Sequence, residues 1–189
     1  MRIFLNDRDY RHFVYLLSDV VERFDIECWN YCLMPNHYHL TVMPNLPNIS
    51  EAVRRLNSIY ALWWNRQHKQ VGHVFQGRFK AQIVQEDGYL TTLCRYVALN
   101  PVRARLVTHP EEWKWSSYAA TVGPQSPPAF LTLGPTLRRF GSDDDPRLRQ
   151  RFREFVTRRG EIPICDDRFR SSEGVIGDKP FKASVRAKR

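Results

Sequence analysis

The sequence lacks the long apolar runs and paired cysteines that identify several common classes of protein. No stretch of its 189 residues approaches the roughly 18 consecutive apolar residues of a membrane-spanning helix, so no membrane partner is expected. Its four cysteines include no CxxC pair, which favours reduced thiols. Because the chain turns polar soon after Met1, its start does not resemble a secretory signal, and we expect a cytoplasmic protein.

Acidic side chains are scarce in the middle of the chain. The whole sequence has 29 lysines and arginines against 20 acidic residues, a formal net charge of +9. Residues 54–105 hold nine basic and two acidic side chains, together with several aromatic residues. Cations that pair with phosphates and rings that stack on bases are typical of a nucleic-acid surface. Scattered surface cations and an ordinary aromatic core would look similar, so charge alone favours nucleic-acid binding only slightly.

The spacing of apolar residues predicts alternating helices and strands. Apolar positions three and four apart predict a helix from Asp7, its N-cap, to Phe24. A change to period two predicts strands over 27–33 and 37–43, joined by a turn at 34–36. Further expected elements are a helix from Ser50 through Trp63, a loop over 72–78, a strand over 79–84, a helix over 88–100 closed by Pro101, and a helix opened by Asp145-Pro146 and stopped by Gly160.

These elements divide the chain into three parts. We expect a main domain over residues 1–122, a helical extension over 123–160 and a basic, flexible tail over 161–189. In the extension, the residues expected to face inward are Leu148, Phe152, Phe155 and Val156.

Two histidines lie two residues apart in the second predicted strand. Because strand side chains alternate, His37, His39 and Thr41 share one face, while Tyr38 and Leu40 share the other. Two imidazoles on one face can chelate one metal ion. For an isolated His-x-His, a surface histidine beside a hydrogen-bonded core histidine is the commoner arrangement.

A tyrosine and an asparagine lie four residues apart on the helix predicted over 88–100. Tyr96 and Asn100 therefore share a face, at the edge of the apolar stripe. A tyrosine hydroxyl can be a nucleophile, and an amide oxygen can complete a site for a hard metal ion. A tyrosine at such an edge more often only packs against the core. The functional interpretation of Tyr96 and Asn100 becomes stronger because the same short chain also has the histidine pair.

Four blocks of sequence carry a likeness to a known family: Met34-Pro35-Asn36-His37-Tyr38-His39-Leu40, Gly72-His73-Val74-Phe75-Gln76-Gly77-Arg78-Phe79-Lys80, Arg95-Tyr96-Val97-Ala98-Leu99-Asn100-Pro101-Val102-Arg103-Ala104 and Trp115-Ser116-Ser117-Tyr118. They resemble the REP-associated tyrosine transposases, in order and spacing, over about residues 3–160. These enzymes belong to the single-tyrosine transposases named HUH after a His-hydrophobic-His motif.

The resemblance implies an active site and a reaction. His37 and His39 would bind a divalent cation, Mg²⁺ or Mn²⁺, and Asn100 would complete the protein ligands. Tyr96 would attack a phosphodiester, release a 3′-hydroxyl and keep the 5′ end as a phosphotyrosine, which a second 3′-hydroxyl can resolve. The expected function is therefore metal-dependent nicking and strand transfer of single-stranded DNA, the activity of a transposase.

The resemblance also implies the substrate, hairpin-forming palindromic DNA with a single-stranded flank. The candidate DNA contacts are Arg54, Arg55, Arg66, Lys69, His73, Phe75, Arg78, Lys80 and Arg103. Each of them could equally be an ordinary surface residue. The basic helix over 145–160 is a candidate second DNA surface. We expect a monomer or homodimer associated with the nucleoid.

The fold that the resemblance implies is α+β, a ferredoxin-like antiparallel sheet with helices on one face and a basic helical extension. Relatives begin with a further strand before the segment that matches Ile3-Phe4-Leu5, and this sequence starts after it. Because that strand is internal in such a sheet, its absence is expected to leave backbone groups unpaired.

Two other functions stay open. A domesticated or truncated hairpin-binding protein would bind the same DNA and form no covalent adduct. A replication initiator or relaxase would share the His-x-His motif, but the block over 115–118 fits such a nuclease less well.

Overall fold

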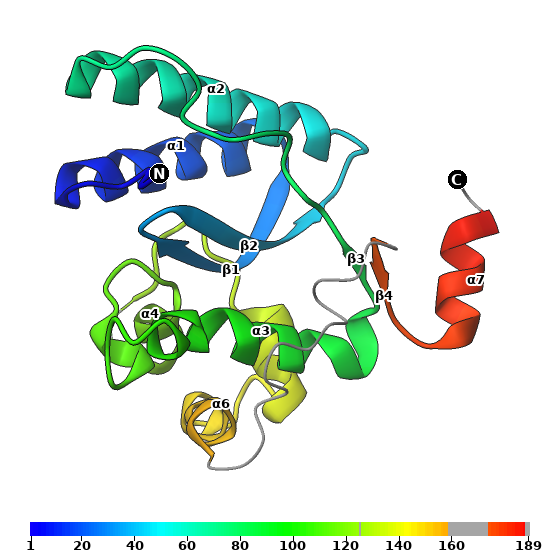
Figure 1. Cartoon of the computed structure of the whole chain (residues 1–189). Coiled ribbons are helices and arrows are strands. Elements are labelled where there is room, and N and C mark those ends of the chain that lie inside the picture. The colour runs from blue at the N-terminus through cyan, green and yellow to red at the C-terminus, as the bar shows by residue number, and fades with distance from the viewer. Residues whose placement is uncertain (125, 159–173, 188–189) are drawn as a thin grey trace.

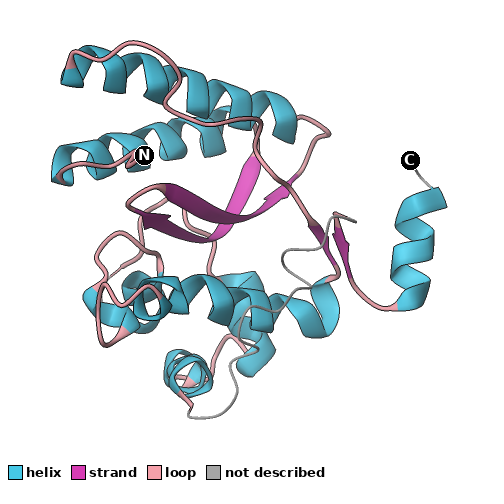
Figure 2. Cartoon of the chain, viewed as in Figure 1, coloured by secondary structure: helices cyan, strands magenta, loops and turns pink. Residues whose placement is uncertain are grey.

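The computed structural model describes residues 1–124, 126–158 and 174–187 of the chain, and it has an α+β fold (Figures 1 and 2). This class is the one that the sequence predicts. The elements are α1 (Asp7–Arg23), β1 (Ile26–Met34), β2 (His37–Pro44), α2 (Ile49–His68), β3 (Ile83–Val84), α3 (Glu86–Arg103), α4 (Tyr118–Val122), α5 (Gly134–Leu137), α6 (Leu148–Thr157), β4 (Val175–Ile176) and α7 (Lys179–Ala187), with 3₁₀ turns η1 (Pro110–Glu112) and η2 (Arg138–Phe140). None of the described helices is long and apolar enough to cross a membrane.

The antiparallel hairpin β1–β2 is the centre of the fold. Its register pairs Met34 with His37 across the turn, as the change of period predicts, and a bulge lies between Cys28 and Asn30. Helices α1 and α2 lie on one face of the hairpin and α3 on the other (Figure 1). The structure thus differs from the predicted arrangement with helices on one face. The near-continuous burial of β1 agrees with cover on both faces.

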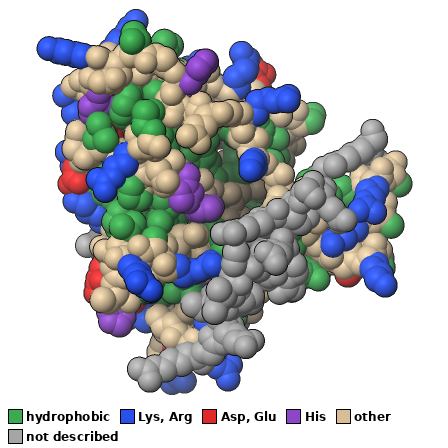
Figure 3. All heavy atoms as spheres, in the orientation of Figure 1, with side chains coloured by type: hydrophobic (Ala, Val, Ile, Leu, Met, Phe, Trp, Pro, Cys, Tyr) green, Lys and Arg blue, Asp and Glu red, His purple; other side chains and the backbone are tan. Residues whose placement is uncertain are grey.

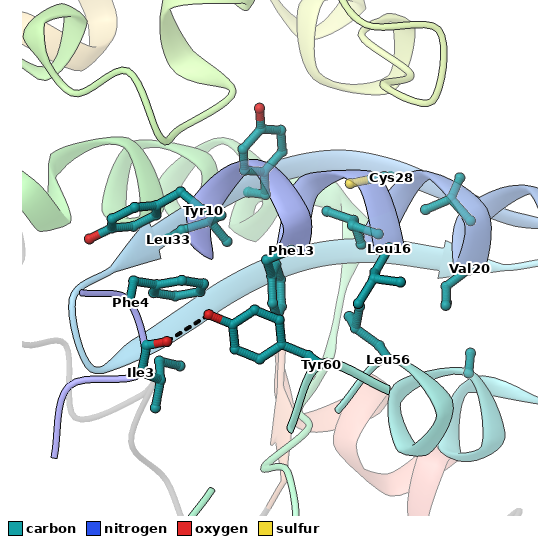
Figure 4. Packing of buried hydrophobic residues seen from close by; sticks show 14 of the residues in the cluster. Ile3, Phe4, Tyr10, Phe13, Leu16, Val20, Cys28, Leu33, Leu56 and Tyr60 are labelled. Carbon is teal, nitrogen blue, oxygen red and sulfur yellow. Dashed lines mark hydrogen bonds between the residues drawn. The ribbon is translucent and has the colours of Figure 1, made fainter. Parts of the chain in front are cut away.

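The main core lies between the hairpin and the pair α1–α2. Phe13 and Leu17 of α1 pack with Leu56 and Tyr60 of α2, all of them at most 2% exposed. Figure 4 shows Phe13, Leu56 and Tyr60 within this cluster. The Tyr60 hydroxyl donates to the Ile3 carbonyl at 2.6 Å, which ties the N-terminal segment to α2. Burying a phenol with its hydroxyl bonded avoids the cost of an unmet polar group.

Two helix starts differ from the predicted ones. Asn6, not Asp7, caps α1, because its side chain accepts from the backbone of Arg8 and Asp9 while the Asp9 carboxylate accepts from the Asn6 N–H. Helix α2 begins before the predicted cap Ser50, which lies in the first turn. Both differences are one or two residues, the usual uncertainty of a helix boundary.

Helix α3 is longer at both ends than predicted, and Pro101 lies inside it. Pro101 has no N–H to give to the Val97 carbonyl, so a break was expected. The Asn100 amide nitrogen instead donates to the carbonyls of Tyr96 and Val97, at 2.9 and 3.5 Å. This side-chain bond compensates for part of what the proline removes and lets the last turn form.

The edge of β1 that faces away from β2 is bonded to later segments of the chain. Leu33 donates to the Trp115 carbonyl, Ser117 donates to the Tyr31 carbonyl, and Thr132 donates to the Cys28 carbonyl, at 2.8–3.0 Å. These contacts pair part of the outer edge of β1. They also fix the block over 115–118 against the hairpin.

The last described residues form elements that the sequence does not predict. Strand β4 pairs in parallel with β3, which occupies only the end of the strand expected over 79–84. Helix α7 follows β4. In α6 the predicted inward residues Leu148, Phe152 and Val156 are buried, and Phe155 is half-buried. The predicted stop at Gly160 lies outside the described residues.

Candidate active site

His37 and His39 lie side by side on the face of β2 that looks toward α3. Tyr38 and Leu40 pack in the core on the opposite face, as strand alternation predicts. The Nε2 atoms of the two histidines are 3.1 Å apart. Two ligands about 2.1 Å from one ion, at right angles, would be about 3 Å apart. The pair therefore has the spacing of two adjacent ligand positions around a single divalent cation.

Asn36, in the hairpin turn, sets the orientation of the first histidine. Its side-chain oxygen lies 2.7 Å from His37 Nδ1. A neutral His37 that donates from Nδ1 presents the lone pair of Nε2 toward His39, the form in which imidazole binds a metal. The sequence pattern assigns no role to Asn36. Its position in a turn, directly before the histidine, is the signal that could have indicated one.

Both histidines favour the neutral form at pH 7. Burial lowers the pKa of His39 to about 4, with smaller effects from the neighbouring His37 and Arg103. Burial also lowers the pKa of His37. A neutral imidazole is required for metal binding, so the site needs little deprotonation to accept an ion.

The pKa of His39 predicts how stability depends on pH in metal-free buffer. Unfolded histidine titrates near its ordinary pKa of 6.5, while folded His39 titrates near 4, so in this interval the unfolded chain binds the extra proton. The free energy of unfolding is therefore highest above pH 6.5, where His39 is neutral in both states, and it decreases as the pH falls toward 4. We expect the Tm of His39→Gln to fall less than that of wild type between pH 7 and pH 5, measured by circular dichroism with EDTA. Parallel Tm curves for the two proteins would contradict this.

Tyr96 and Arg103 of α3 complete a cluster with the histidines. The rings of Tyr96 and His39 meet edge to face, with centroids 5.8 Å apart. The Arg103 guanidinium lies over the Tyr96 ring, 5.0 Å from its centroid. The structure thus brings a candidate nucleophile, two candidate metal ligands and a cation together within one chain.

Asn100 is half-buried one turn beyond Tyr96 on α3. Its amide nitrogen is bonded to the helix carbonyls, which leaves its oxygen as the atom that can act as a ligand. Within the described residues no group of three His, Cys, Asp or Glu could hold a metal ion. An ion at His37 and His39 would therefore need oxygen ligands from an amide, water or substrate.

A buried polar network fixes α3 against the hairpin. Asn30 of β1 donates to the Cys94 carbonyl of α3 at 3.3 Å and accepts from the Ser117 hydroxyl at 2.5 Å. The same hydroxyl accepts from the Tyr31 N–H at 3.0 Å. Asn30 is 5% exposed and Ser117 1%, so these bonds form away from water. Apolar contacts are not directional and would tolerate a shift of α3 along its axis. The hydrogen bond from Asn30 instead fixes the position of Cys94, two residues before Tyr96, relative to β1.

Ser117→Ala is expected to destabilise the fold by about 2 kcal/mol, because it leaves the Asn30 oxygen and the Tyr31 N–H buried without their partner. Urea unfolding measures this as a lower midpoint. Ser58, exposed on α2, offers a matched control, and Ser58→Ala is expected to change stability by less than about 0.5 kcal/mol. Equal stability of the two variants would contradict the role of the network.

The candidate DNA contacts divide into two groups. Those on α2 lie on the other side of the hairpin from the histidines. There the guanidinium of Arg54 is 4.0 Å from the carboxylate of Glu51, and that of Arg55 is 3.8 Å from the carboxylate of Asp19. Such exposed pairs contribute little to stability. Arg66 and Lys69 are also on this side, at the exposed end of α2 and at its C-cap.

The loop after α2 carries the rest of the predicted contacts except Arg103. His73, Arg78 and Lys80 are exposed, while Phe75 packs against Tyr38 and Tyr60 and is part of the core edge. Lys and Arg side chains are spread over the face in Figure 3, where acidic side chains are sparse. Arg103, the remaining predicted contact, lies over the Tyr96 ring.

The arginines of α6 are used within the fold. Arg149 donates to the carbonyls of Ala120 and Gly123, and Arg151 donates to the Phe140 carbonyl. Arg153 forms an ion pair with Glu111 at 3.2 Å. These bonds give the arginines of α6 roles within the fold, and a second DNA surface on this helix stays a prediction.

Comparison with known proteins identifies a family. The model of a family described as "Transposase IS200 like" matches residues 2–100, just over half of the chain. The matched segment includes His37, His39, Tyr96 and Asn100 and ends before Arg103. No curated protein and no solved structure matches the chain.

Proposed function

This chain belongs to the family of IS200-like transposases, and on that premise we propose that it nicks and rejoins single-stranded DNA through a 5′-phosphotyrosine at Tyr96. The observation that carries the proposal is the juxtaposition of three side chains. His37 and His39 have their Nε2 atoms 3.1 Å apart, and the Tyr96 ring packs against His39. Each of these residue types suits one role in phosphodiester cleavage, and the contacts of His39 with both His37 and Tyr96 support the proposal.

His37, His39 and the Asn100 oxygen would hold Mg²⁺ or Mn²⁺. When bound, such an ion polarises the scissile phosphate and orients it for in-line attack. Two imidazoles beside oxygen ligands suit Mn²⁺ at least as well as Mg²⁺. The fit rests on the 3.1 Å spacing of the Nε2 atoms and on the neutral state of both rings.

Tyr96 would form the covalent bond to DNA. Its hydroxyl oxygen attacks the phosphorus, the bond from phosphorus to the 3′ oxygen breaks, and the strand leaves with a free 3′-hydroxyl. The phenolic proton passes to solvent as the new bond forms, and the departing 3′ oxygen takes up a proton from solvent. Because the phosphotyrosine keeps the phosphodiester bond energy, a second 3′-hydroxyl can displace Tyr96 and join two strands. Since Tyr96 contacts His39 of its own chain, each subunit has its own complete site in this proposal.

The proposed substrate is an imperfect palindrome folded as a hairpin with a single-stranded flank. An open site between a strand and a helix suits a flexible single strand better than a rigid duplex. The exposed cations Arg78 and Lys80 lie in the loop that leads to β3 and α3, and they can contact phosphates along such a strand. The likeness to REP-associated transposases supports this substrate.

Incubation of the protein with end-labelled hairpin DNA tests the proposal. With Mn²⁺ or Mg²⁺ we expect a labelled protein band that survives denaturing electrophoresis, and no band with EDTA. The same sequence as a blunt duplex is the control and is expected to react far less. Tight hairpin binding without any adduct would favour a hairpin-binding protein that does not cleave.

A further inference from the structure

Arg103 stands out among the arginines of α3 by what surrounds it. Arg95, on the same helix, is bonded to the carbonyls of Val156 and Arg158, at 3.2 and 2.7 Å. The Arg103 Nη1 atom is buried, and among the described residues it has no hydrogen-bond partner. No described Asp or Glu forms an ion pair with Arg103 either. A buried donor of this kind is costly to leave unmet, so Arg103, unlike Arg95, keeps hydrogen-bonding capacity that the described residues do not use.

The same guanidinium lies against the ring of the proposed nucleophile. Its Cζ is 5.0 Å from the centroid of the Tyr96 ring, over the ring face. Arg103 follows Tyr96 by two helical turns and therefore lies on the same side of α3. His39 meets the same tyrosine ring at nearly a right angle. Arg103 is thus beside the proposed nucleophile, whereas a residue that only contacts the DNA backbone would lie on the outer surface.

We propose that Arg103 is a catalytic residue, which binds a non-bridging oxygen of the scissile phosphate and at the same time holds the Tyr96 ring for attack. This proposal rests on the proposed function. The planar guanidinium has several donors in a fixed fork, so one face can pack on the phenol while the N–H groups at its edge donate to the phosphate. As the bond from Tyr96 to phosphorus forms and the bond to the 3′ oxygen breaks, negative charge on the non-bridging oxygens is stabilised by this donor.

Single-turnover kinetics at saturating hairpin DNA test the role. Arg103→Gln removes the charge and is expected to slow adduct formation by about 100-fold or more, while the Kd for the hairpin rises less than about threefold. Arg103→Lys keeps the charge without the fork, so we expect it to recover no more than about tenfold of the lost rate. Arg105→Gln, an exposed neighbour outside α3, is the matched control and is expected to react like wild type.

A stereospecific substrate gives a second readout. Sulfur in place of the non-bridging oxygen that faces Arg103 is expected to slow wild type more than the opposite diastereomer, and Arg103→Gln is expected to lose this preference. If Arg103→Gln weakens hairpin binding but forms adduct at the wild-type rate, Arg103 is only a backbone contact and the proposal is wrong. If wild type forms no adduct, the proposed function itself fails. If Arg103→Gln does not fold, Arg103→Lys and the diastereomer preference decide the question.

Discussion

Tyr96→Phe is expected to abolish the covalent protein–DNA adduct and to leave hairpin binding within about threefold of wild type. The substitution removes only the hydroxyl, so the ring contacts with His39 and Arg103 can remain. Without the attacking oxygen there is no route to a phosphotyrosine, and loss of a catalytic nucleophile typically costs at least about a thousandfold in rate. Denaturing electrophoresis of labelled DNA measures the adduct, and gel shift measures binding.

Tyr15 on α1 provides the control for this substitution. It is 68% exposed and lies on the helix layer across the hairpin from α3. Tyr15→Phe should therefore form adduct at the wild-type rate. An adduct that persists in Tyr96→Phe would mean that another side chain is the nucleophile, and the assignment of Tyr96 would have to be abandoned.

Removal of the histidine pair is expected to have the second large effect. His37→Ala and His39→Ala each delete one of the two imidazole ligands, and we expect each to lower the cleavage rate by more than about 100-fold. Calorimetric titration with Mn²⁺ should show binding to wild type and much weaker binding to either variant. The affinity for hairpin DNA without metal should change little, because neither ring is part of the core and both variants should therefore keep the fold.

The matched control for the histidines is His109, which is exposed beside η1 and distant in sequence from β2. His109→Gln is expected to bind Mn²⁺ and cleave like wild type. Cleavage at the wild-type rate by the double variant His37→Ala/His39→Ala would exclude these residues as ligands. Addition of EDTA to wild type should reproduce the loss seen in the variants.

Strand alternation was enough to predict which histidines share a face, because the period of a strand is two and the hairpin turn fixes the register. His37 and His39 therefore lie together, with Tyr38 on the core side, as expected. Helical spacing likewise placed Tyr96 and Asn100 on one side of α3. These are local relations, which depend on a few neighbouring residues.

Contacts between distant parts of the chain could not be predicted in this way. The network of Asn30, Ser117 and the Cys94 carbonyl joins three segments far apart in the sequence, and no periodic pattern reports it. Pro101 was expected to end α3, but the Asn100 side chain compensates for it. The pairing of β3 with β4 was missed because each strand has only two residues.

The two arginines that flank the site show the same limit. In the sequence Arg95 and Arg103 look equivalent, since both are basic residues on the helix that carries Tyr96. The structure bonds Arg95 to carbonyls at the end of α6 and leaves Nη1 of Arg103 buried beside Tyr96 without a partner among the described residues. Only three-dimensional contacts distinguish an arginine that is bonded within the fold from one whose Nη1 has no partner among the described residues.

The central claim is that one chain carries a complete site for covalent DNA cleavage, and peptide mapping of the adduct tests it most directly. Wild-type protein is allowed to react with hairpin DNA and Mn²⁺, digested with protease and nuclease, and analysed by mass spectrometry. We predict a single modified peptide, in which a nucleotide is attached through its 5′ phosphate to Tyr96. A modification at a different residue, or hairpin binding with no modified peptide, would contradict the claim.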